Sequence, residues 1–369
     1  MRALLFSLAV GMMLDKVPVM AAAPAAKNLV LIMTDGLRWQ EVFNGADPQL
    51  LNKEHGGVEN LEKIQLAYGR GSNAEKRTAL MPFFWNVIAK QGQLFGNQAK
   101  GSVVKVSNRL NFSYPGYSET FTGKVDPKMN SNEKVSNPNV NVFEWLNQRA
   151  AFKGKVAAFG TWEVFPYILN RDRSGLPVFA GFEAITKESP SEKQQVLNEL
   201  IRDTTPIWSS ITLDSFHFQA SMEFIRLKRP RLLFIGYGET DEWAHSGRYD
   251  QVLEAAHRVD DYIRRLWEVL LYTPGYRNNT VIVVTTDHGR GQGLKDWKNH
   301  GEKVPGSEGT WLAVLGPKVA ALGERTNTPP VLHTQIAPTI AALLGEDFKA
   351  SFPESSEPIL DVLPGGQKP

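Results

Sequence analysis

Five side chains that can bind metal ions stand close to strand-like apolar runs in this sequence. Asp35 follows one such run, and Asp287 with His288 follows another. Asp241 and His245 share a Thr-Asp-Glu-Trp-Ala-His segment. In open α/β sheets, ligands bind outside the carboxyl ends of the strands. Carboxylates and imidazoles delivered there by separate strands predict a metal site.

The spacing of these residues indicates more than one ion. Asp241 and His245 are four residues apart, so on a helix they project from one face. Gly36 and Gly289 follow ligand positions and permit tight turns. His300, in an Asn-His-Gly segment, is placed to reach the same rim. Three carboxylates and three imidazoles suit two metal ions roughly 3.5–4 Å apart, which together stabilise the entering and leaving oxygens of an in-line displacement.

Each residue taken alone also has a structural interpretation. A strand-end aspartate commonly caps a helix, and an isolated Asp-x-x-x-His pair often arises by chance. His217 and His257 lie within helical patterns and His333 just ahead of one, so we expect structural or solvated roles for these three. The joint placement of the other residues on separate strand ends favours metal binding.

A candidate nucleophile lies in the segment Asn111 to Gly123. Pro115 suits a first helical turn, so Ser113 is predicted just ahead of a helix N-terminus, where free N–H groups favour a phosphate-like anion. A serine there becomes nucleophilic when its hydroxyl loses a proton, for example through coordination to a metal. The alternative is that Ser113 only caps the helix. Weaker candidates inside the same helix are Ser118, Thr120 and Thr122.

Apolar runs alternate with helical patterns along the chain. Nearly continuous apolar runs are typical of strands buried on both faces of a parallel sheet, so the alternation predicts a doubly wound α/β fold. We expect one domain over residues 24–352, with a polar loop or lid at about 43–77 and a flexible tail over 353–369. The expected strands are Asn28–Met33, Lys155–Phe159, Arg231–Ile235, Thr280–Thr285 and Trp311–Leu315. The expected helices are Met81–Gln91, Val142–Gln148, Ser191–Arg202, Asp214–Leu227, Gln251–Leu270 and Thr334–Leu344.

Composition narrows the classes of function. The 369 residues carry a formal net charge of +2, which gives no support for binding to a nucleic-acid polymer or a membrane surface through bulk charge. The chain has 0 cysteines, so disulfides, thiol nucleophiles and thiolate ligands are excluded. Metal binding is left to histidine and carboxylates, a set that suits zinc or manganese.

The first 23 residues have the pattern of a signal peptide. Arg2 gives a basic start, Ala3 to Leu14 is apolar, and the three alanines at 21–23 offer a cleavage site. The apolar run is too short for an ordinary membrane-spanning helix, and no later segment is long and apolar enough. We expect an exported protein, periplasmic or secreted. An uncleaved anchor or a disordered tail is the alternative.

Taken together, these motifs resemble those of the alkaline phosphatase superfamily, within it the nucleotide pyrophosphatase/phosphodiesterase-like and phosphoglycerate-mutase-like branches. The resemblance covers nearly the whole mature chain, with the motifs in the family's order. It implies an alkaline-phosphatase-like sandwich, with a central, mostly parallel sheet flanked by helices on both faces. The matching segments are Met33–Gly36, Ser113–Tyr117, Thr240–His245, Thr286–Gly289, Asn299–Gly301 and Gln335–Thr339.

The resemblance also implies roles for single residues. One ion, most often Zn²⁺ with Mn²⁺ as the alternative, would be held by Asp241, His245 and His300, and a second by Asp35, Asp287 and His288. Ser113 would attack the phosphorus of a small phosphate ester and form a phosphoseryl intermediate. His333 stays a competitor of His300. Weak candidates for substrate binding are Asn132, Lys134 and Arg248, with Asn137, Arg290 and Lys298 nearby in sequence.

Other interpretations remain at this point. A sulfatase shares the fold, but Tyr117 stands where its Ser-x-Pro-x-Arg motif has arginine. A phosphoglycerate mutase matches the serine and metal pattern, although the leader argues against a cytoplasmic enzyme. A metal-binding or phosphate-binding protein with an inactive site is the alternative without catalysis. Neither the preference for monoesters or diesters nor the oligomeric state follows from the sequence.

Overall fold

The fold is built on an eight-stranded sheet in the order β10-β2-β9-β7-β1-β6-β4-β5. The computed structural model describes residues 24–186 and 189–366, so the predicted signal peptide lies outside the described residues. β1 pairs in parallel with β6 and β7, and β9 runs antiparallel to β7 and β2. The strands of this sheet are β1 (Asn28–Thr34), β2 (Gln93–Phe95), β4 (Val156–Gly160), β5 (Val178–Ala180), β6 (Leu232–Tyr237), β7 (Thr280–Thr286), β9 (Leu312–Leu315) and β10 (Gly323–Glu324). A small second sheet contains β3 (Val104–Lys105), β8 (Gly309–Thr310) and β11 (Val331–Leu332).

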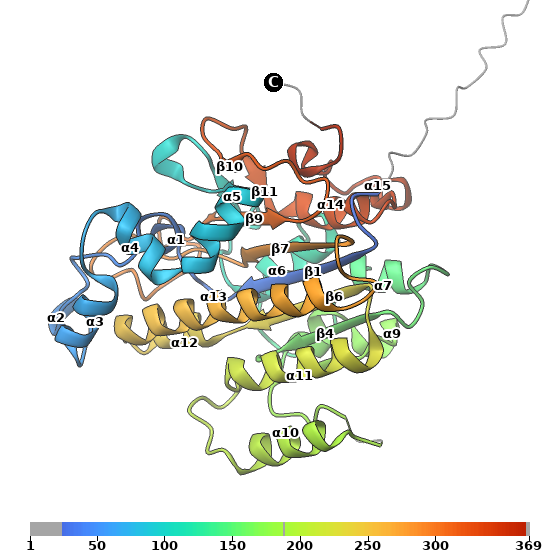
Figure 1. The fold of residues 1–369 in the computed structure, drawn as a ribbon, viewed down its shortest axis with the longest axis horizontal. Helices are drawn as coiled ribbons and strands as arrows, with labels where there is room; N and C mark the ends of the chain where they lie inside the picture. Colours follow the sequence, from blue (N-terminus) through green and yellow to red (C-terminus); the bar gives the residue numbers. More distant parts are fainter. Residues whose placement is uncertain (1–23, 187–188, 367–369) are drawn as a thin grey trace, which may run out of the picture.

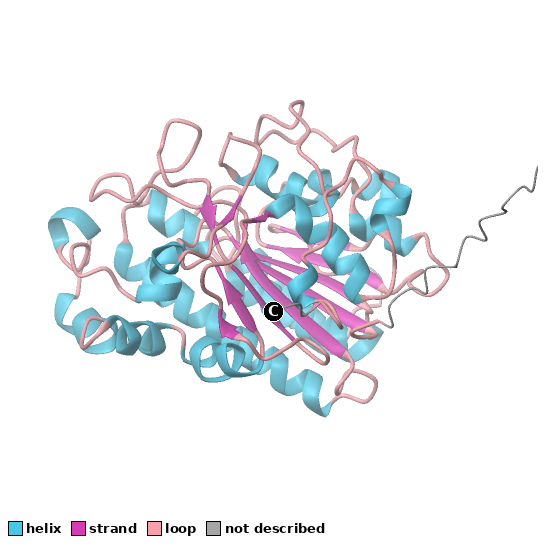
Figure 2. Ribbon diagram, turned by 90° about the horizontal axis from the view of Figure 1, so that it is seen from above, coloured by secondary structure: helices cyan, strands magenta, loops and turns pink. Residues whose placement is uncertain are grey.

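Helices cover both faces of the large sheet, as predicted, because its central strands are apolar on both sides. Val30 and Ile32 of β1 enter one hydrophobic core, whereas Leu29, Leu31 and Met33 enter the other. Figure 2 shows the strands lying between helices. The α/β sandwich predicted from the sequence is therefore confirmed.

Each core has its own set of helices (Figure 1). The first core receives side chains from α1 (Trp39–Asn44), α3 (Leu61–Tyr68), α4 (Asn73–Leu80), η1 (Phe84–Ile88), α10 (Glu192–Asp203), α11 (Asp214–Lys228), α12 (Glu239–His245) and α13 (Tyr249–Tyr272). The second receives them from α6 (Ser113–Thr122), α7 (Val142–Asn147), α8 (Phe165–Ile168), α14 (Ile336–Leu343), α15 (Phe348–Ser351) and η4 (Leu360–Val362). The remaining short helices are α2 (Lys53–Gly56), α5 (Ala89–Gln91), α9 (Arg171–Ser174), η2 (Gln98–Lys100) and η3 (His333–Gln335).

Two segments differ from the expectation. The segment 43–77, expected as a polar loop or lid, contains α2, α3 and the start of α4, and Ile64 and Tyr68 of α3 are buried. The tail expected to be flexible from Pro353 packs against the body as far as the structure describes it, with Ile359 and Val362 buried. In both segments a few widely spaced apolar residues reach a core, although the surrounding sequence is polar or rich in proline and glycine.

The parallel strands bring the predicted ligands to one edge of the sheet. Thr34, the last residue of β1, is in register with Tyr237 at the end of β6 and with Thr286 at the end of β7. The residues that follow these three strands therefore meet outside the same carboxyl edge.

Candidate metal centre

Asp35, Asp287 and His288 form a buried group at the carboxyl ends of β1 and β7. His288 Nε2 lies 3.2 Å from Asp35 Oδ1 and 3.5 Å from Asp287 Oδ2. One ligand atom from each residue lies within 4.8 Å of the other two, which is close enough for one metal ion. Asp35 follows β1, and Asp287 and His288 follow β7, so the pairing of these strands brings the group together.

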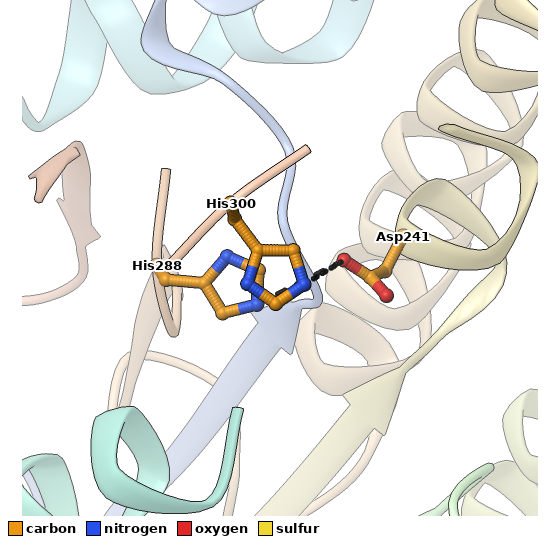
Figure 3. A group of neighbouring side chains, drawn as sticks. All are labelled: Asp241, His288 and His300. Carbon is orange, nitrogen blue, oxygen red and sulfur yellow. Dashed lines mark ion pairs between the residues drawn. The ribbon is translucent and has the colours of Figure 1, made fainter. Parts of the chain in front are cut away.

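A second group lies beside the first and is centred on Asp241. Ligand atoms of Asp241, His288 and His300 also lie within 4.8 Å of one another (Figure 3). His245 joins them, because its Nε2 is 3.1 Å from Asp241 Oδ2 and 3.0 Å from His300 Nε2. Asp241 and His245 are one helical turn apart on α12, as their spacing predicted. The structure thus brings together all six predicted ligands, which we call the ligand cluster: Asp35, Asp241, His245, Asp287, His288 and His300.

The chemistry of the ligand cluster fits divalent cations. Asp287 Oδ2 is fully buried and has no hydrogen-bond partner among the described residues, and buried polar atoms are rarely left in that state. Burial raises the pKa of Asp35 and of Asp287 well above the usual range, and the neighbouring aspartates add to this effect. Burial also lowers the pKa of His300 to about 2, which keeps its imidazole neutral. Concentrated carboxylates beside neutral imidazoles are a ligand set for zinc-like ions.

Backbone contacts fix the spacing of the ligand cluster. Gly36 has φ +59°, and a Cβ there would lie 2.6 Å from Asp241 Oδ1. Its amide N–H donates to Asp287 Oδ1 at 3.1 Å, and the Thr240 hydroxyl donates to the carbonyl oxygen of Asp35 at 2.5 Å. These bonds join the segments that follow β1, β6 and β7.

Ser113 is the first residue of α6 and faces the ligand cluster. Its Oγ lies 3.5 Å from Asp35 Oδ1 and 3.4 Å from His288 Nε2. The N-cap position belongs to Phe112, so the helix-cap alternative for Ser113 is not what the structure shows. The first turn of α6 lies close to the strand end that carries Asp287, because Gly116 approaches the backbone of that residue closely: a Cβ on Gly116 would lie 2.3 Å from the Asp287 carbonyl oxygen.

Two further residues contact the ligand cluster and were not assigned from the sequence. The buried Tyr117 hydroxyl donates to Asp35 Oδ2 at 3.2 Å. The buried guanidinium of Arg290 donates to Asp241 Oδ1 and to the carbonyl oxygen of Gly36. Tyr117 is four residues after Ser113 on one helix and Arg290 directly follows the Asp-His-Gly segment, so sequence position offered a signal for both. Burial opposes ionisation of Asp241, but Arg290 lowers the pKa of this carboxyl well below its usual range.

The three histidines that were predicted to have structural or solvated roles lie outside the ligand cluster. His333 is buried, and its two ring nitrogens lie 2.9 Å from the hydroxyls of Thr120 and Thr310. It therefore does not compete with His300. The rings of His217 and His257 contact the carbonyl oxygens of Gly181 and Leu80, respectively.

A cavity of about 410 Å³ opens onto Ser113 and the ligand cluster. Asn132 and Lys134, two of the weak substrate-binding candidates, line it, and Asn132 Oδ1 accepts from the amide of Tyr114 at 3.0 Å. The third candidate, Arg248, does not line the cavity, because its guanidinium is engaged by Glu59 and Asp250, both at 2.9 Å. We call the following lining residues the cavity wall: Asn132, Glu133, Lys134, Trp162 and Glu163.

The chain is similar to one protein family and to several solved structures. Residues 70–322 match the profile of the type I phosphodiesterase / nucleotide pyrophosphatase family. A search of curated proteins found no match. Among solved structures, alkaline phosphatase PafA is similar with a TM-score of 0.60 at 12% identity, covering 93% of this chain and 100% of that one. The lipoteichoic acid synthase LtaP of Listeria monocytogenes gives 0.56 at 12% identity, with 89% and 74% covered.

A putative sulfatase from Bacteroides thetaiotaomicron is also similar, with a TM-score of 0.53 at 13% identity, covering 93% of this chain and 75% of the sulfatase. At such low identities, these three structures establish the shared fold alone. The fold is common to enzymes with different ester substrates, so the chemistry has to be argued from the site.

Proposed function

The chain belongs to the type I phosphodiesterase and nucleotide pyrophosphatase family, within the alkaline phosphatase superfamily, and on this basis we propose that it hydrolyses phosphoric esters with two divalent metal ions and Ser113. The family and the fold support a hydrolase of phosphate or sulfate esters. The observation that carries the finer proposal is the position of Ser113 Oγ, 3.5 Å from Asp35 and 3.4 Å from His288 at the edge of the ligand cluster.

In the proposed site each residue of the ligand cluster has a role. Asp35, Asp287 and His288 would hold one ion, and Asp241, His245 and His300 the other, with Zn²⁺ preferred and Mn²⁺ as the alternative. When bound, such ions favour the deprotonated form of a hydroxyl or water and neutralise charge on phosphoryl oxygens. Tyr117 and Arg290 orient Asp35 and Asp241 through hydrogen bonds.

Ser113 supplies the nucleophile in this proposal. Its Oγ forms a bond to phosphorus while the bond from phosphorus to the leaving oxygen breaks on the opposite side, which gives a phosphoseryl intermediate. Water then hydrolyses this ester, releases phosphate or a phosphate monoester, and restores the Ser113 hydroxyl. The amino end of α6 faces the same space and favours an anion there.

The charges around the cavity favour a diester over a monoester. Of the lysine and arginine side chains in the described part of the chain, only Lys134 lines the cavity, and its Nζ is 2.9 Å from Glu163 Oε1. Glu133 and Glu242 also line it. A monoester carries a second negative charge, which these carboxylates would repel, whereas a diester does not. We therefore propose a small phosphodiester as the substrate.

We also propose that the protein acts in the periplasm or after secretion. The proposal rests on the leader-like pattern of residues 1–23. No helix in the part of the chain that the structure describes is long and apolar enough to cross a membrane.

The test is turnover of a chromogenic phosphodiester, phosphomonoester and sulfate ester by purified protein whose metal content has been counted. We expect the diester to be hydrolysed fastest, and we expect Ser113→Ala to abolish turnover. Ser118→Ala is the matched control, because Ser118 lies on the same helix and its hydroxyl contacts Asn137 rather than the ligand cluster. Equal activity in Ser113→Ala would refute the serine mechanism, and a preference for sulfate would identify a sulfatase.

A further inference from the structure

The two halves of the ligand cluster differ in their surroundings, because among the described residues an arginine side chain forms an ion pair with only one of them. Arg290 is 2% exposed, and its guanidinium forms an ion pair with Asp241. In the other half, Asp35 accepts from the Tyr117 hydroxyl and Asp287 from the amide of Gly36. Those partners are neutral, so the charge of this half is not compensated by direct contact.

The carboxylate oxygens that are free to bind a metal ion are also distributed unequally between the two halves. Asp287 Oδ2 has no hydrogen-bond partner within the described ranges, and its half contains two carboxylates. In the second half, Arg290 occupies Asp241 Oδ1, and His245 Nε2 lies 3.1 Å from Oδ2. A dication entering the second half must share Asp241 with a fixed positive charge, whereas the first half offers it two carboxylates that form no ion pair with an arginine or lysine of the described residues.

We propose that Arg290 makes the two halves bind metal in a fixed order, with a tight ion at Asp35, Asp287 and His288 and a weaker, exchangeable ion at Asp241, His245 and His300. This inference rests on the proposed two-metal function and adds a residue that sets the affinity of one half. The enzyme would then hold one ion permanently and depend on the free metal concentration for the second.

Arg290 also holds several backbone segments together. A purely structural role would predict the opposite effect of its replacement on metal binding. Its donors reach the carbonyl oxygens of Gly36, Asp241 and Lys298 at 3.2, 3.1 and 2.7 Å, respectively. If Arg290 were only a scaffold, any replacement would loosen the second half and weaken metal binding there. If its charge matters, removing the charge strengthens binding in the second half.

The experiment is a calorimetric titration of the metal-free full-length protein with Zn²⁺ in the presence of a competing chelator. For the wild type we expect two binding steps whose dissociation constants differ by about tenfold or more. Arg290→Met should tighten the second step by about tenfold, because it removes the positive charge. Arg290→Lys keeps the charge, so its second step should stay weak. Arg248→Met is the matched control, since Arg248 pairs with Glu59 and Asp250 outside the cavity.

Ligand variants decide the order of binding even if the Arg290 variants fold poorly. Asp241→Asn should keep the tight step and lose the weak one, whereas Asp287→Asn should lose the tight step. Two equal steps in the wild type, weaker second steps in both Arg290 variants, or a tight step that survives in Asp287→Asn would each overturn the proposal. A protein that binds no divalent ion would instead refute the proposed function, and one that binds two ions equally while turning over esters through Ser113 would refute this inference alone.

Discussion

Apart from His245, the ligand cluster is buried or nearly so and is cross-linked, whereas the cavity wall, apart from the buried Trp162, is more exposed and held by few contacts. Asp35, Asp287 and His288 are at most 3% exposed and are joined to one another and to their surroundings by several hydrogen bonds. Across the cavity, the Lys134 side chain is 48% exposed and that of Glu163 is 36% exposed, with one ion pair between them. Exposed pairs of this kind contribute little to stability.

This difference separates two tasks of one site. Groups that stabilise charge during a reaction need fixed positions in a water-poor environment, which strand ends provide. Groups that select a leaving group act at the surface, where loops can change without damage to the core. Substitutions in the ligand cluster should therefore lower kcat, and those in the cavity wall should mainly change KM.

The largest effect is expected for His288→Ala, because this imidazole belongs to both metal-binding groups. Even residues that only support metal ligands typically change activity 10- to 100-fold, so we expect kcat/KM to fall by more than about 100-fold. Steady-state kinetics would measure the loss of activity, and metal analysis would measure the loss of bound metal. His257→Ala, whose ring contacts the Leu80 carbonyl away from the cavity, should retain activity.

A pair of tyrosines on α6 tests the comparison within one helix. Tyr117→Phe removes the hydroxyl that donates to Asp35 Oδ2, and we expect kcat to fall by about tenfold. Tyr114→Phe removes a 2.6 Å hydrogen bond to the carbonyl oxygen of Val135, next to the cavity wall, so KM should rise with little change in kcat. Equal effects of both variants on kcat would contradict the separation of tasks.

A smaller effect is expected for Lys134→Ala in the cavity wall. Since Lys134 is exposed and paired with Glu163, its loss should raise KM for a phosphodiester by only a few-fold and leave kcat nearly unchanged. Glu163→Gln removes the competing carboxylate and should lower KM. A large fall in kcat for Lys134→Ala would place this lysine at the reacting phosphate instead.

The smallest expected effect concerns stability, and it arises at the buried Glu119 of α6. Burial raises the pKa of Glu119 from 4.5 to about 8, although the amide of Ser107 donates to both carboxylate oxygens. The folded protein therefore holds a proton that the unfolded chain releases, so this residue makes stability fall as pH rises from about 4.5 to about 8. Thermal unfolding of Glu119→Gln should show a flatter dependence on pH than the wild type over this range, and an unchanged slope would contradict the assignment.

The residues of the ligand cluster were predictable because a buried parallel strand leaves a clear apolar run, and the residue after it must lie at the carboxyl edge. Asp35 and Asp287 follow directly from this rule. Arg290 was visible only as a neighbour in sequence, because nothing in the chain states whether its side chain turns toward Asp241. The direction of the Arg248 side chain was hidden from the sequence in the same way, since it turns toward Asp250 and Glu59.

The cavity wall and the outer segments were harder to predict because their apolar signals are sparse. Asn132 and Lys134 were weak candidates that came only from the family resemblance, and Glu163 was not a candidate at all. The helices within residues 43–77 each bury few side chains. Among them α4 packs against α1 and α13, and α3 packs against α4, so tertiary contacts rather than a periodic pattern place these two helices.

Gly116 lies so close to the Asp287 carbonyl oxygen that the position of Ser113 depends on residue 116 having no side chain. A Cβ at residue 116 would lie 2.3 Å from that oxygen, with backbone on one side and helix on the other. Even alanine would push α6 outward and carry Ser113 with it. Position 116 should therefore accept no other amino acid in an active enzyme, although it never touches a substrate.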